Sequence, residues 1–389
     1  MPADREIDIA VIGAGAAGLT AAYSLRALGL NALRDFMVFD AQPAPGATWQ
    51  HAWSSLTVGR AVELGELPDI AGQADLGLSF RDLDPSRRVH EAVGATWRYY
   101  QDAYGLFVAH GMRVTSVRSR PRRDDLRLTV RGPTGAEREV STRVLINATG
   151  SWSNPFVPWY PGQLEFEGPQ RHAYRIERFG EFRDRRVLVV GGGRSAVAVL
   201  LELERRGIRT LWSTRRTPDF PTRPTLGIRH RRSYTVHELA NANLSKVRRM
   251  LERGTRMPSD VSVRGLPMSR AIFEAQRRGT LVSRGPIERL LPGGVRFVDG
   301  TVEAVDAVVW ATGGRESLRH LAPLGLRDAG GSPKISGGWS RRDDRVAFLG
   351  YGPGIDPVDS LDEALEIGQD AIDRLAAPSV EVARGIMTR

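Results

Sequence analysis

Near its start the chain reads IDIAVIGAGAAG, from Ile7 to Gly18, an apolar run of strand length followed by glycines. A helix-forming run from Leu19 to Leu28 comes next, and a second apolar run, Phe36 to Phe39, ends in Asp40. This order predicts a strand, a tight turn, a helix and a second strand. The glycines have the G-x-G-x-x-G spacing within that unit, so the segment indicates a dinucleotide-binding fold.

Each glycine of this turn has its own physical task. Gly13 lets the chain turn off the strand, Gly15 leaves the backbone open to a pyrophosphate, and Gly18 allows close helix–strand packing. The helix N-terminus then offers free N–H groups and a positive dipole end to the phosphates. Asp40 stands where an acidic side chain accepts from a ribose hydroxyl. The alternative is a glycine-rich turn beside an ordinary acid that ends a strand.

The same pattern returns in the middle of the chain. Arg186 to Val190 predicts a strand, Val197 to Arg206 a helix and Thr210 to Ser213 another strand. The candidate nucleotide-binding residues of this second glycine turn are Gly191, Gly193 and Ser195.

The second unit ends differently from the first. Its second strand is followed by Thr214, Arg215, Arg216 and Thr217, whereas the second strand of the first unit is followed by Asp40. An acid would repel the 2′-phosphate of NADPH, whereas an arginine accepts it with aligned, charge-assisted hydrogen bonds. Two units with these endings predict FAD at the first turn and NADPH at the second. A solvated loop is the alternative interpretation of Arg215 and Arg216.

Composition narrows the functional classes. The 389 residues are enough for two or three domains. The absence of cysteine excludes disulfides, thiolate metal sites and a dithiol relay, and the seven histidines have no paired spacing, so no metal site is expected. The first strand begins almost at once and no apolar run could span a bilayer, so we expect a cytoplasmic enzyme without a membrane segment.

The formal net charge of +10 comes almost entirely from arginine, since the chain has only two lysines. A coding bias towards arginine explains this at least as well as function does. The richest cluster, Arg229 to Arg232, has one aromatic neighbour, Tyr234. Nucleic-acid binding is therefore not expected, although the charge could attract anionic ligands such as NADPH.

Further patterns along the chain predict connecting segments, strands and helices. Residues 57–86 indicate an irregular excursion, and residues 151–169, with four prolines, a linker. Further strands are expected at 112–117, 126–130, 139–148, 295–298, 305–310 and 345–349. Further helices are expected at 86–110, 237–251, 271–278 and 360–375.

The expected fold class is therefore α/β, with two Rossmann-like dinucleotide-binding domains, the NADPH domain being inserted into the FAD domain. We assign residues 1–160 and 295–389 to the FAD-binding domain. Residues 161–294 form the NADPH-binding domain, in which 218–266 is a candidate lid or substrate wall.

Other segments contribute further candidate cofactor-binding residues. The loop after Asp40 contains Thr48 and Trp49, whose ring could stack on a ring system or pack in the core. Thr149 and Gly150 follow a predicted strand in an Ala-Thr-Gly segment that recurs at 311–313. A late glycine-rich turn with Gly350 and Tyr351 could close the first domain around the flavin.

With these motifs the sequence resembles the flavin-containing monooxygenases of the small bacterial type. The resemblance covers most of the chain. It rests on both glycine turns, the Gly46–Trp49 loop, the two Ala-Thr-Gly segments, Gly350–Gly352, and Phe166–His172, which matches F-x-G-x-x-x-H.

The resemblance implies an FAD- and NADPH-dependent monooxygenase. NADPH would reduce the flavin, and a flavin peroxide adduct would pass one oxygen atom from O2 to a small organic substrate, either a soft nitrogen or sulfur nucleophile or a ketone. No catalytic side chain is assigned; His172 is expected to position the linker, with direct catalysis the less favoured role. The alternatives are an NADPH-dependent flavin reductase or oxidase and a non-catalytic nucleotide-binding protein, and a homodimer is left open.

Overall fold

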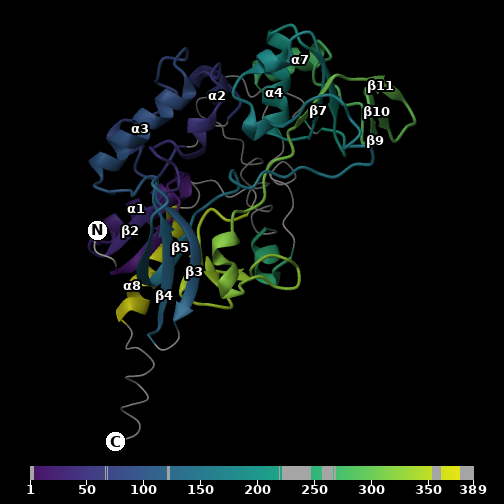
Figure 1. The fold of residues 1–389 in the computed structure, drawn as a ribbon. Coiled ribbons are helices and arrows are strands. Elements are labelled where there is room, and N and C mark those ends of the chain that lie inside the picture. The colour runs from purple at the N-terminus through teal and green to yellow at the C-terminus, as the bar shows by residue number, and fades with distance from the viewer. Residues whose placement is uncertain are drawn as a thin grey trace, which may run out of the picture.

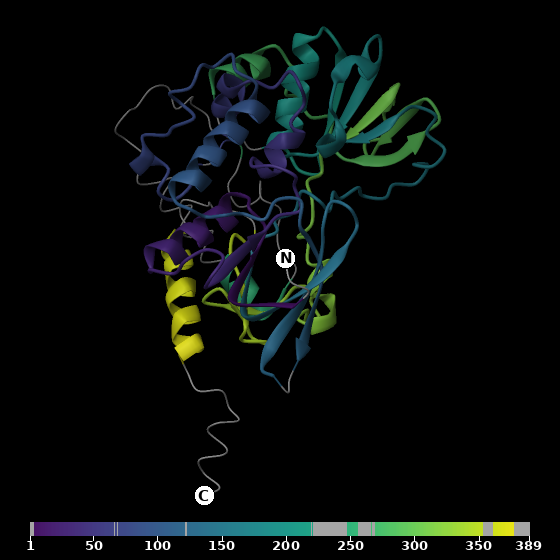
Figure 2. The ribbon, with the colours of Figure 1, turned by 60° about the vertical axis from the view of Figure 1, so that its left-hand side comes forward.

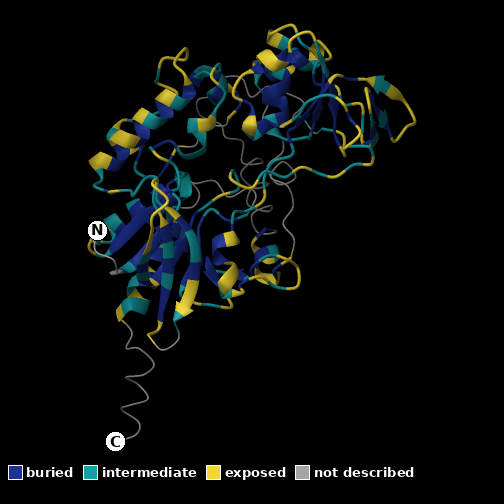
Figure 3. Cartoon of the chain, in the orientation of Figure 1, coloured by how far each residue is buried: buried dark blue, intermediate teal, exposed yellow. Residues whose placement is uncertain are grey.

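The protein folds into two α/β units that lie side by side (Figure 1). This computed structural model describes residues 4–65, 67, 69–120, 123–218, 220, 247–255, 266, 269–352 and 361–376. In Figure 3 the strands at the centre of both units are the most completely buried parts of the chain.

The first unit is built on an eight-stranded sheet. Its order is β13-β14-β15-β5-β1-β2, and β4 and β3 continue from β5. The strands are β1 (Asp4–Ile12), β2 (Phe36–Phe39), β3 (Arg113–Arg120), β4 (Asp125–Arg131), β5 (Glu137–Asn147), β13 (Ile335–Ser336), β14 (Trp339–Ser340) and β15 (Val346–Phe348).

The central strands of this sheet are parallel, so their carboxyl ends meet at one edge. Ile12 is in register with Phe39 and Asn147, and Asn147 is in register with Phe348. The edge where four strands end together is where nucleotides bind in open α/β sheets.

Helices cover one face of that sheet, and β3 and β4 curl across the other. Ile9 and Val11 of β1 pack with the helices, while Ala10 and Ile12 face the opposite core, as the two-residue period of a strand requires. Figure 2 shows α8 lying along the helical face. These helices are α1 (Ala16–Ala27), α3 (Val89–Ala103) and α8 (Leu361–Ala376).

The second unit has two sheets. Four parallel strands lie in the order β6-β12-β7-β8, and an antiparallel sheet in the order β11-β10-β9 packs beside them. The strands are β6 (Gln170–His172), β7 (Arg186–Val190), β8 (Arg209–Ser213), β9 (Ile287–Leu291), β10 (Gly294–Phe297), β11 (Val302–Ala304) and β12 (Ala307–Trp310). The helices are α4 (Arg194–Arg205) and α7 (Arg270–Arg277).

This pairing corrects the expected boundary at residue 295. β10 belongs to the small antiparallel sheet, and β12 lies between β6 and β7, so residues 294–310 are part of the second unit. The Ala-Thr-Gly segment after β12 resembles the one after β5 because each follows a central strand and crosses a glycine turn. Because the two segments are so similar, the sequence does not indicate which of the two sheets contains β12.

The excursion at 57–86 contains a helix that the sequence analysis missed, α2 (Val58–Glu63). Short 3-10 helices also occur: η1 (Ala47–His51), η2 (Ala74–Leu76), η3 (Ala173–Arg175), η4 (Phe179–Phe182) and η5 (Arg319–Leu324). β9 was missed as well, because it is short and follows a proline.

Most of the candidate lid at 218–266 lies outside the described residues. Residues 247–253 are helical, at the end of the helix expected at 237–251. Val247 and Leu251 are buried in the core of the first unit, beside residues of η5. No helix among the described residues is long and apolar enough to cross a membrane.

Candidate functional site

The first glycine turn lies at the carboxyl edge of the large sheet. Gly13 has a positive φ of 101°, and its N–H donates to the carbonyl oxygen of Phe39 at 2.8 Å. A Cβ at Gly13 would lie 2.5 Å from the carbonyl oxygen of Ala148, and one at Gly18 would collide with the carbonyl of Gly13. Both positions therefore require glycine, as the spacing predicted.

Gly15 differs from its neighbours because space opens beside it. A Cβ there would have only the Cβ of Ala47 within 4 Å, at 3.8 Å. Gly15 is also the N-cap of α1, which has no side-chain cap and no acid in its first turn. The free N–H groups and the positive end of the helix dipole can thus face an anion approaching this backbone.

Asp40 contacts the same turn directly. Its Oδ2 accepts from the N–H of Ala14 at 2.8 Å, and its Oδ1 accepts from the N–H of Gln42 at 2.7 Å. Burial raises the pKa of this carboxyl, and the two N–H donors oppose that rise. Each carboxylate oxygen keeps a second lone pair, so acceptance from a ribose hydroxyl stays compatible with this geometry.

The other residues expected at the first site gather around the start of α1. Thr48 and Trp49 lie in η1, which begins at Ala47, opposite Gly15. A Cβ at Gly350 would lie 2.6 Å from the Cβ of Ala17, so the late turn does return to α1, and Tyr351 beside it is buried.

Thr149 and Gly150 follow Ala148, whose carbonyl closes the turn at Gly13. The Oγ1 of Thr149 donates to the carbonyl oxygen of Ser317 at 3.1 Å. Gly150 has a positive φ of 60°. The chain therefore leaves the carboxyl edge of the large sheet through a short turn that is fixed to the segment before η5.

The second glycine turn repeats the first almost group for group. Gly191 has a φ of 135°, its N–H donates to Ser213 at 3.0 Å, and a Cβ there would collide with the carbonyl of Ala311. Gly193 has open space around it and is the N-cap of α4, again without a side-chain cap or an acid in the first turn. The buried Ala196 stands where the first turn has Gly18.

Arg215 and Arg216 are exposed and line a cavity of about 470 Å³ at the end of β8. The buried Thr214 connects this cavity to the turn, because a Cβ at Gly192 would lie 3.7 Å from its Cγ2. The Oγ1 of Thr214 donates to the carbonyl oxygen of Arg216 at 2.7 Å. Pro286, Leu281 and Phe220 supply apolar surface to the same cavity.

Comparison with known proteins identifies the family. Residues 10–254 match the sequence pattern of the pyridine nucleotide-disulphide oxidoreductase family, which is more than half of the 389 residues.

The chain belongs to this family.

Similar proteins narrow the class of oxidoreductase. An indole-3-pyruvate monooxygenase of Oryza sativa subsp. japonica is 26% identical over 339 residues, with 82% of this chain and 79% of that protein covered. Senecionine N-oxygenase of Tyria jacobaeae is 24% identical over 238 residues, which are 55% of this chain and 50% of that protein. A flavin-containing monooxygenase structure from Stenotrophomonas maltophilia has a TM-score of 0.73 and 26% identity, with 96% of this chain and 100% of that chain covered.

These likenesses confirm the expected family, the α/β fold and the enzyme class: the protein is an oxidoreductase of the flavin-dependent monooxygenase kind. They also imply a flavin and a nicotinamide cofactor, together with a small organic substrate and O2. Two open glycine turns with uncapped helices fit two such nucleotides.

His172 of this oxidoreductase has both ring nitrogens engaged. Its Nδ1 accepts from the N–H of Tyr174 at 3.1 Å, so Nε2 carries the hydrogen and donates to the carbonyl oxygen of Gly313 at 3.0 Å. Burial lowers the pKa of His172, which favours the neutral ring. The imidazole thus ties the F-x-G-x-x-x-H segment to the turn after β12.

One pair of polar residues at the first site of the oxidoreductase escaped sequence reasoning. His320 of η5 and Asn147 at the end of β5 are both buried, and the Nε2 of His320 lies 2.8 Å from the Oδ1 of Asn147. Burial lowers the pKa of His320 to about 4, so the neutral ring donates to the amide oxygen. No local pattern signals this pair, because the two residues lie 173 positions apart.

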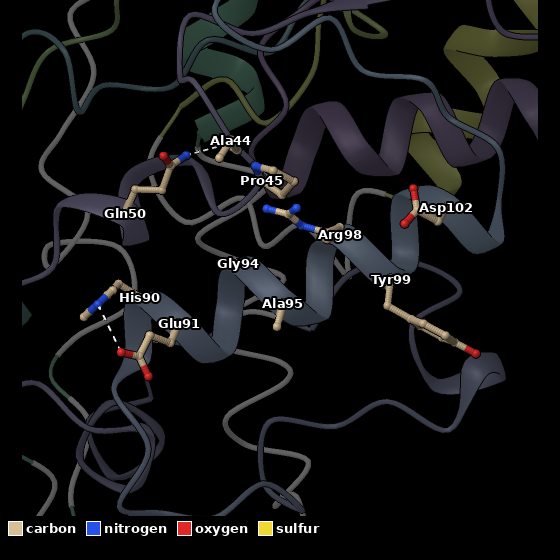
Figure 4. Close-up of a pocket in the computed structure, with 10 residues that line it drawn as sticks. All are labelled: Ala44, Pro45, Gln50, His90, Glu91, Gly94, Ala95, Arg98, Tyr99 and Asp102. Carbon is tan, nitrogen blue, oxygen red and sulfur yellow. Dashed lines mark hydrogen bonds and ion pairs between the residues drawn. The ribbon is translucent and has the colours of Figure 1, made fainter.

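A separate groove of about 680 Å³ runs along the outer face of α3 (Figure 4). It lies behind the Gly46 loop: a Cβ at Gly46 would lie 3.5 Å from the Cα of Gly94 on α3, whereas Ala47 faces Gly15. The groove of the oxidoreductase is lined by Ala44, Pro45, Gln50, His90, Glu91, Gly94, Ala95, Arg98, Tyr99 and Asp102. None of the residues expected to bind the nucleotides lines this groove.

Proposed function

We propose that the first glycine turn binds FAD, that the second binds NADPH, and that the enzyme inserts one oxygen atom of O2 into a small organic substrate. The observation that supports this most strongly is the pairing of two equivalent turns with opposite endings. Both have an open glycine at the start of an uncapped helix, but Asp40 follows β2 and Arg215 and Arg216 follow β8.

At the first site, Gly15 and the start of α1 would hold the pyrophosphate, and Asp40 would accept from a ribose hydroxyl. Thr48 and Trp49 would border the nucleotide from η1, and Gly350 and Tyr351 from the returning turn. The flavin, when bound, accepts a hydride from the nicotinamide and carries out the oxygen chemistry, while the protein binds, orients and excludes water.

At the second site, Gly193 and Ser195 would face the pyrophosphate at the start of α4. Arg215 would receive the 2′-phosphate in the cavity at the end of β8, with Arg216 beside it. His172 would act by positioning, since its two nitrogens hold Tyr174 and Gly313 and leave no lone pair for proton transfer.

The domain division follows from this proposal, adjusted to the strand pairing. The FAD domain would comprise the chain up to about residue 160 and again after Trp310, and the NADPH domain the chain between them. For the substrate, a soft nitrogen or sulfur nucleophile and a ketone remain the proposed classes. An N-oxygenase among the similar proteins supports the first of these.

The test uses the purified protein, NADPH and oxygen gas labelled with ¹⁸O. We expect NADPH consumption to accelerate with a substrate from a panel of thioethers, tertiary amines and ketones, and the product to contain one labelled oxygen atom. The matching control measures hydrogen peroxide without substrate.

Stoichiometric peroxide with every substrate and no labelled product would contradict oxygen insertion and favour the oxidase. A flavin-containing protein that consumes no NADPH would favour the nucleotide-binding alternative.

A further inference from the structure

A buried carboxylate joins the two units. Glu202 lies on α4 of the second unit, with its side chain only 2% exposed. Two of its partners lie in or near α2: Ser55 precedes this helix and Arg60 belongs to it. The Oγ of Ser55 donates to Oε1 at 2.7 Å, and Nη1 of Arg60 lies 3.4 Å from Oε2.

The same carboxylate is also held from its own helix. Nε of Arg206 donates to Oε1 of Glu202 at 2.9 Å, and Arg205 pairs with Oε2. Nη2 of Arg206 donates to the Oγ of Ser55 at 2.9 Å. Ser55, Glu202 and Arg206 thus form a closed triangle of hydrogen bonds, in which the serine hydroxyl both donates and accepts.

Other contacts bring the segment from Trp53 to Gly65 onto the second unit. The ring of Trp53 stands edge-on to Phe179 at 5.4 Å, and Leu64 is buried in the core of the second unit. Nη1 of Arg194, the first residue of α4, donates to the carbonyl oxygen of Gly65 at 2.9 Å.

This segment follows η1 directly in the chain, and η1 borders the first glycine turn. α4 begins at the second glycine turn. A displacement of the segment on α4 would therefore shift one nucleotide site relative to the other.

We propose that Glu202 is a positioning residue that sets the alignment of the two nucleotide sites, and so the rate at which the nicotinamide reduces the flavin. The inference rests on the proposed function, because it requires nucleotides at both turns. Apolar contacts such as Trp53 on Phe179 allow sliding, whereas a desolvated carboxylate with four directional partners has a single favourable arrangement.

The test compares Glu202→Gln and Arg60→Met with the wild type and the double variant. Hydride transfer needs the reacting atoms in contact, and a shift of about 1 Å lowers such rates by about 100-fold. We expect anaerobic reduction of the flavin by NADPH to slow by about 10- to 100-fold in each single variant, with flavin content and the dissociation constant of NADPH unchanged. The double variant should be no slower than the slower single variant, because both changes break one connection.

Glu204→Gln is the matched control. Glu204 lies on the same helix, but its partners Arg278 and Thr280 belong to the second unit, with Nε of Arg278 at 2.9 Å. The flavin of the Glu204→Gln variant should be reduced at the wild-type rate.

A second readout is independent of turnover. Amide hydrogen exchange over residues 54–65 should be faster in Glu202→Gln and Arg60→Met than in the wild type, while β7 and the core of α4 keep their protection.

Reduction at the wild-type rate in both single variants would overturn the proposal. The proposal would also be overturned if the slowing in the double variant equalled the product of the two single effects. A loss of bound flavin in proportion to the loss of reduction rate would overturn it as well. Failure of the proposed function can be distinguished from failure of this inference. In the first case NADPH would not reduce the flavin of the wild type. In the second case the wild type would be reduced normally and only the expected effects of the variants would be missing.

Discussion

The N–H of Ala14 donates to the Oδ2 of Asp40 over 2.8 Å, across 26 positions of the chain. The acid that ends β2 therefore holds the middle of the first glycine turn, in addition to any contact with a nucleotide. Its other oxygen holds Gln42, the second residue of the following loop. A single buried carboxylate thus shapes both sides of the proposed flavin site.

Replacing Asp40 with Asn should weaken the first unit before any nucleotide binds. The amide nitrogen of Asn cannot accept from an N–H, so either Ala14 or Gln42 loses its acceptor. We expect a stability loss of roughly 1.5–3 kcal/mol, measured by urea unfolding of the flavin-free protein, and a lower flavin content. Unchanged unfolding with reduced flavin content would mean that Asp40 serves the ribose alone.

The two open glycines provide a matched pair of variants. Gly15→Val should abolish the flavin absorbance of the purified protein, because the side chain would fill the space into which the backbone opens. Gly193→Val should retain the flavin but weaken nicotinamide binding, for the same reason at the second turn. A flavin spectrum of full strength in Gly15→Val would show that the first site is wrongly assigned.

Arg215→Ala should change the choice between NADPH and NADH. Losing a charged hydrogen bond to the 2′-phosphate costs roughly 1.5–3 kcal/mol, which lowers NADPH affinity by about 10- to 150-fold. NADH affinity should hardly change, and removing Arg216 as well should enlarge the effect. Titration of each nucleotide measures this, and equal losses for both would exclude phosphate recognition by Arg215.

His320 should make the protein less stable in acid. Burial lowers the pKa of His320 to about 4, whereas the pKa of an unfolded histidine is about 6.5. When the pH lies between these two values, the unfolded chain binds a proton at His320 and the folded chain does not, so a fall in pH favours unfolding. The stability contribution is fully present above pH 6.5, and up to roughly 3 kcal/mol is lost by pH 4. His320→Gln keeps a donor for Asn147, so comparing its unfolding with the wild type at about pH 7 and about pH 4.5 isolates this group. Identical slopes would show that His320 does not titrate in this window.

Local spacing predicts most residues of the two proposed nucleotide sites. The turns at Gly13 and Gly191 were predictable because each combines a short apolar run, a conformation that only glycine adopts and an adjacent helix start, all within about 20 residues. Asp40 and Arg215 could be proposed as nucleotide contacts because each follows the second strand of its unit. Strand limits such as Phe36–Phe39 and Arg186–Val190 agree with the structure.

By itself the sequence determined two nucleotide-binding units and their different endings, because those features reside in contiguous residues. Only the tertiary structure decided that β12 completes the second sheet, since an apolar strand fits either sheet equally well. It also decided that Glu202 meets Ser55 across 147 positions and that His320 meets Asn147 across 173. Such pairs have no sequence spacing to reveal them, because their partners lie far apart in the chain and meet only in the folded structure.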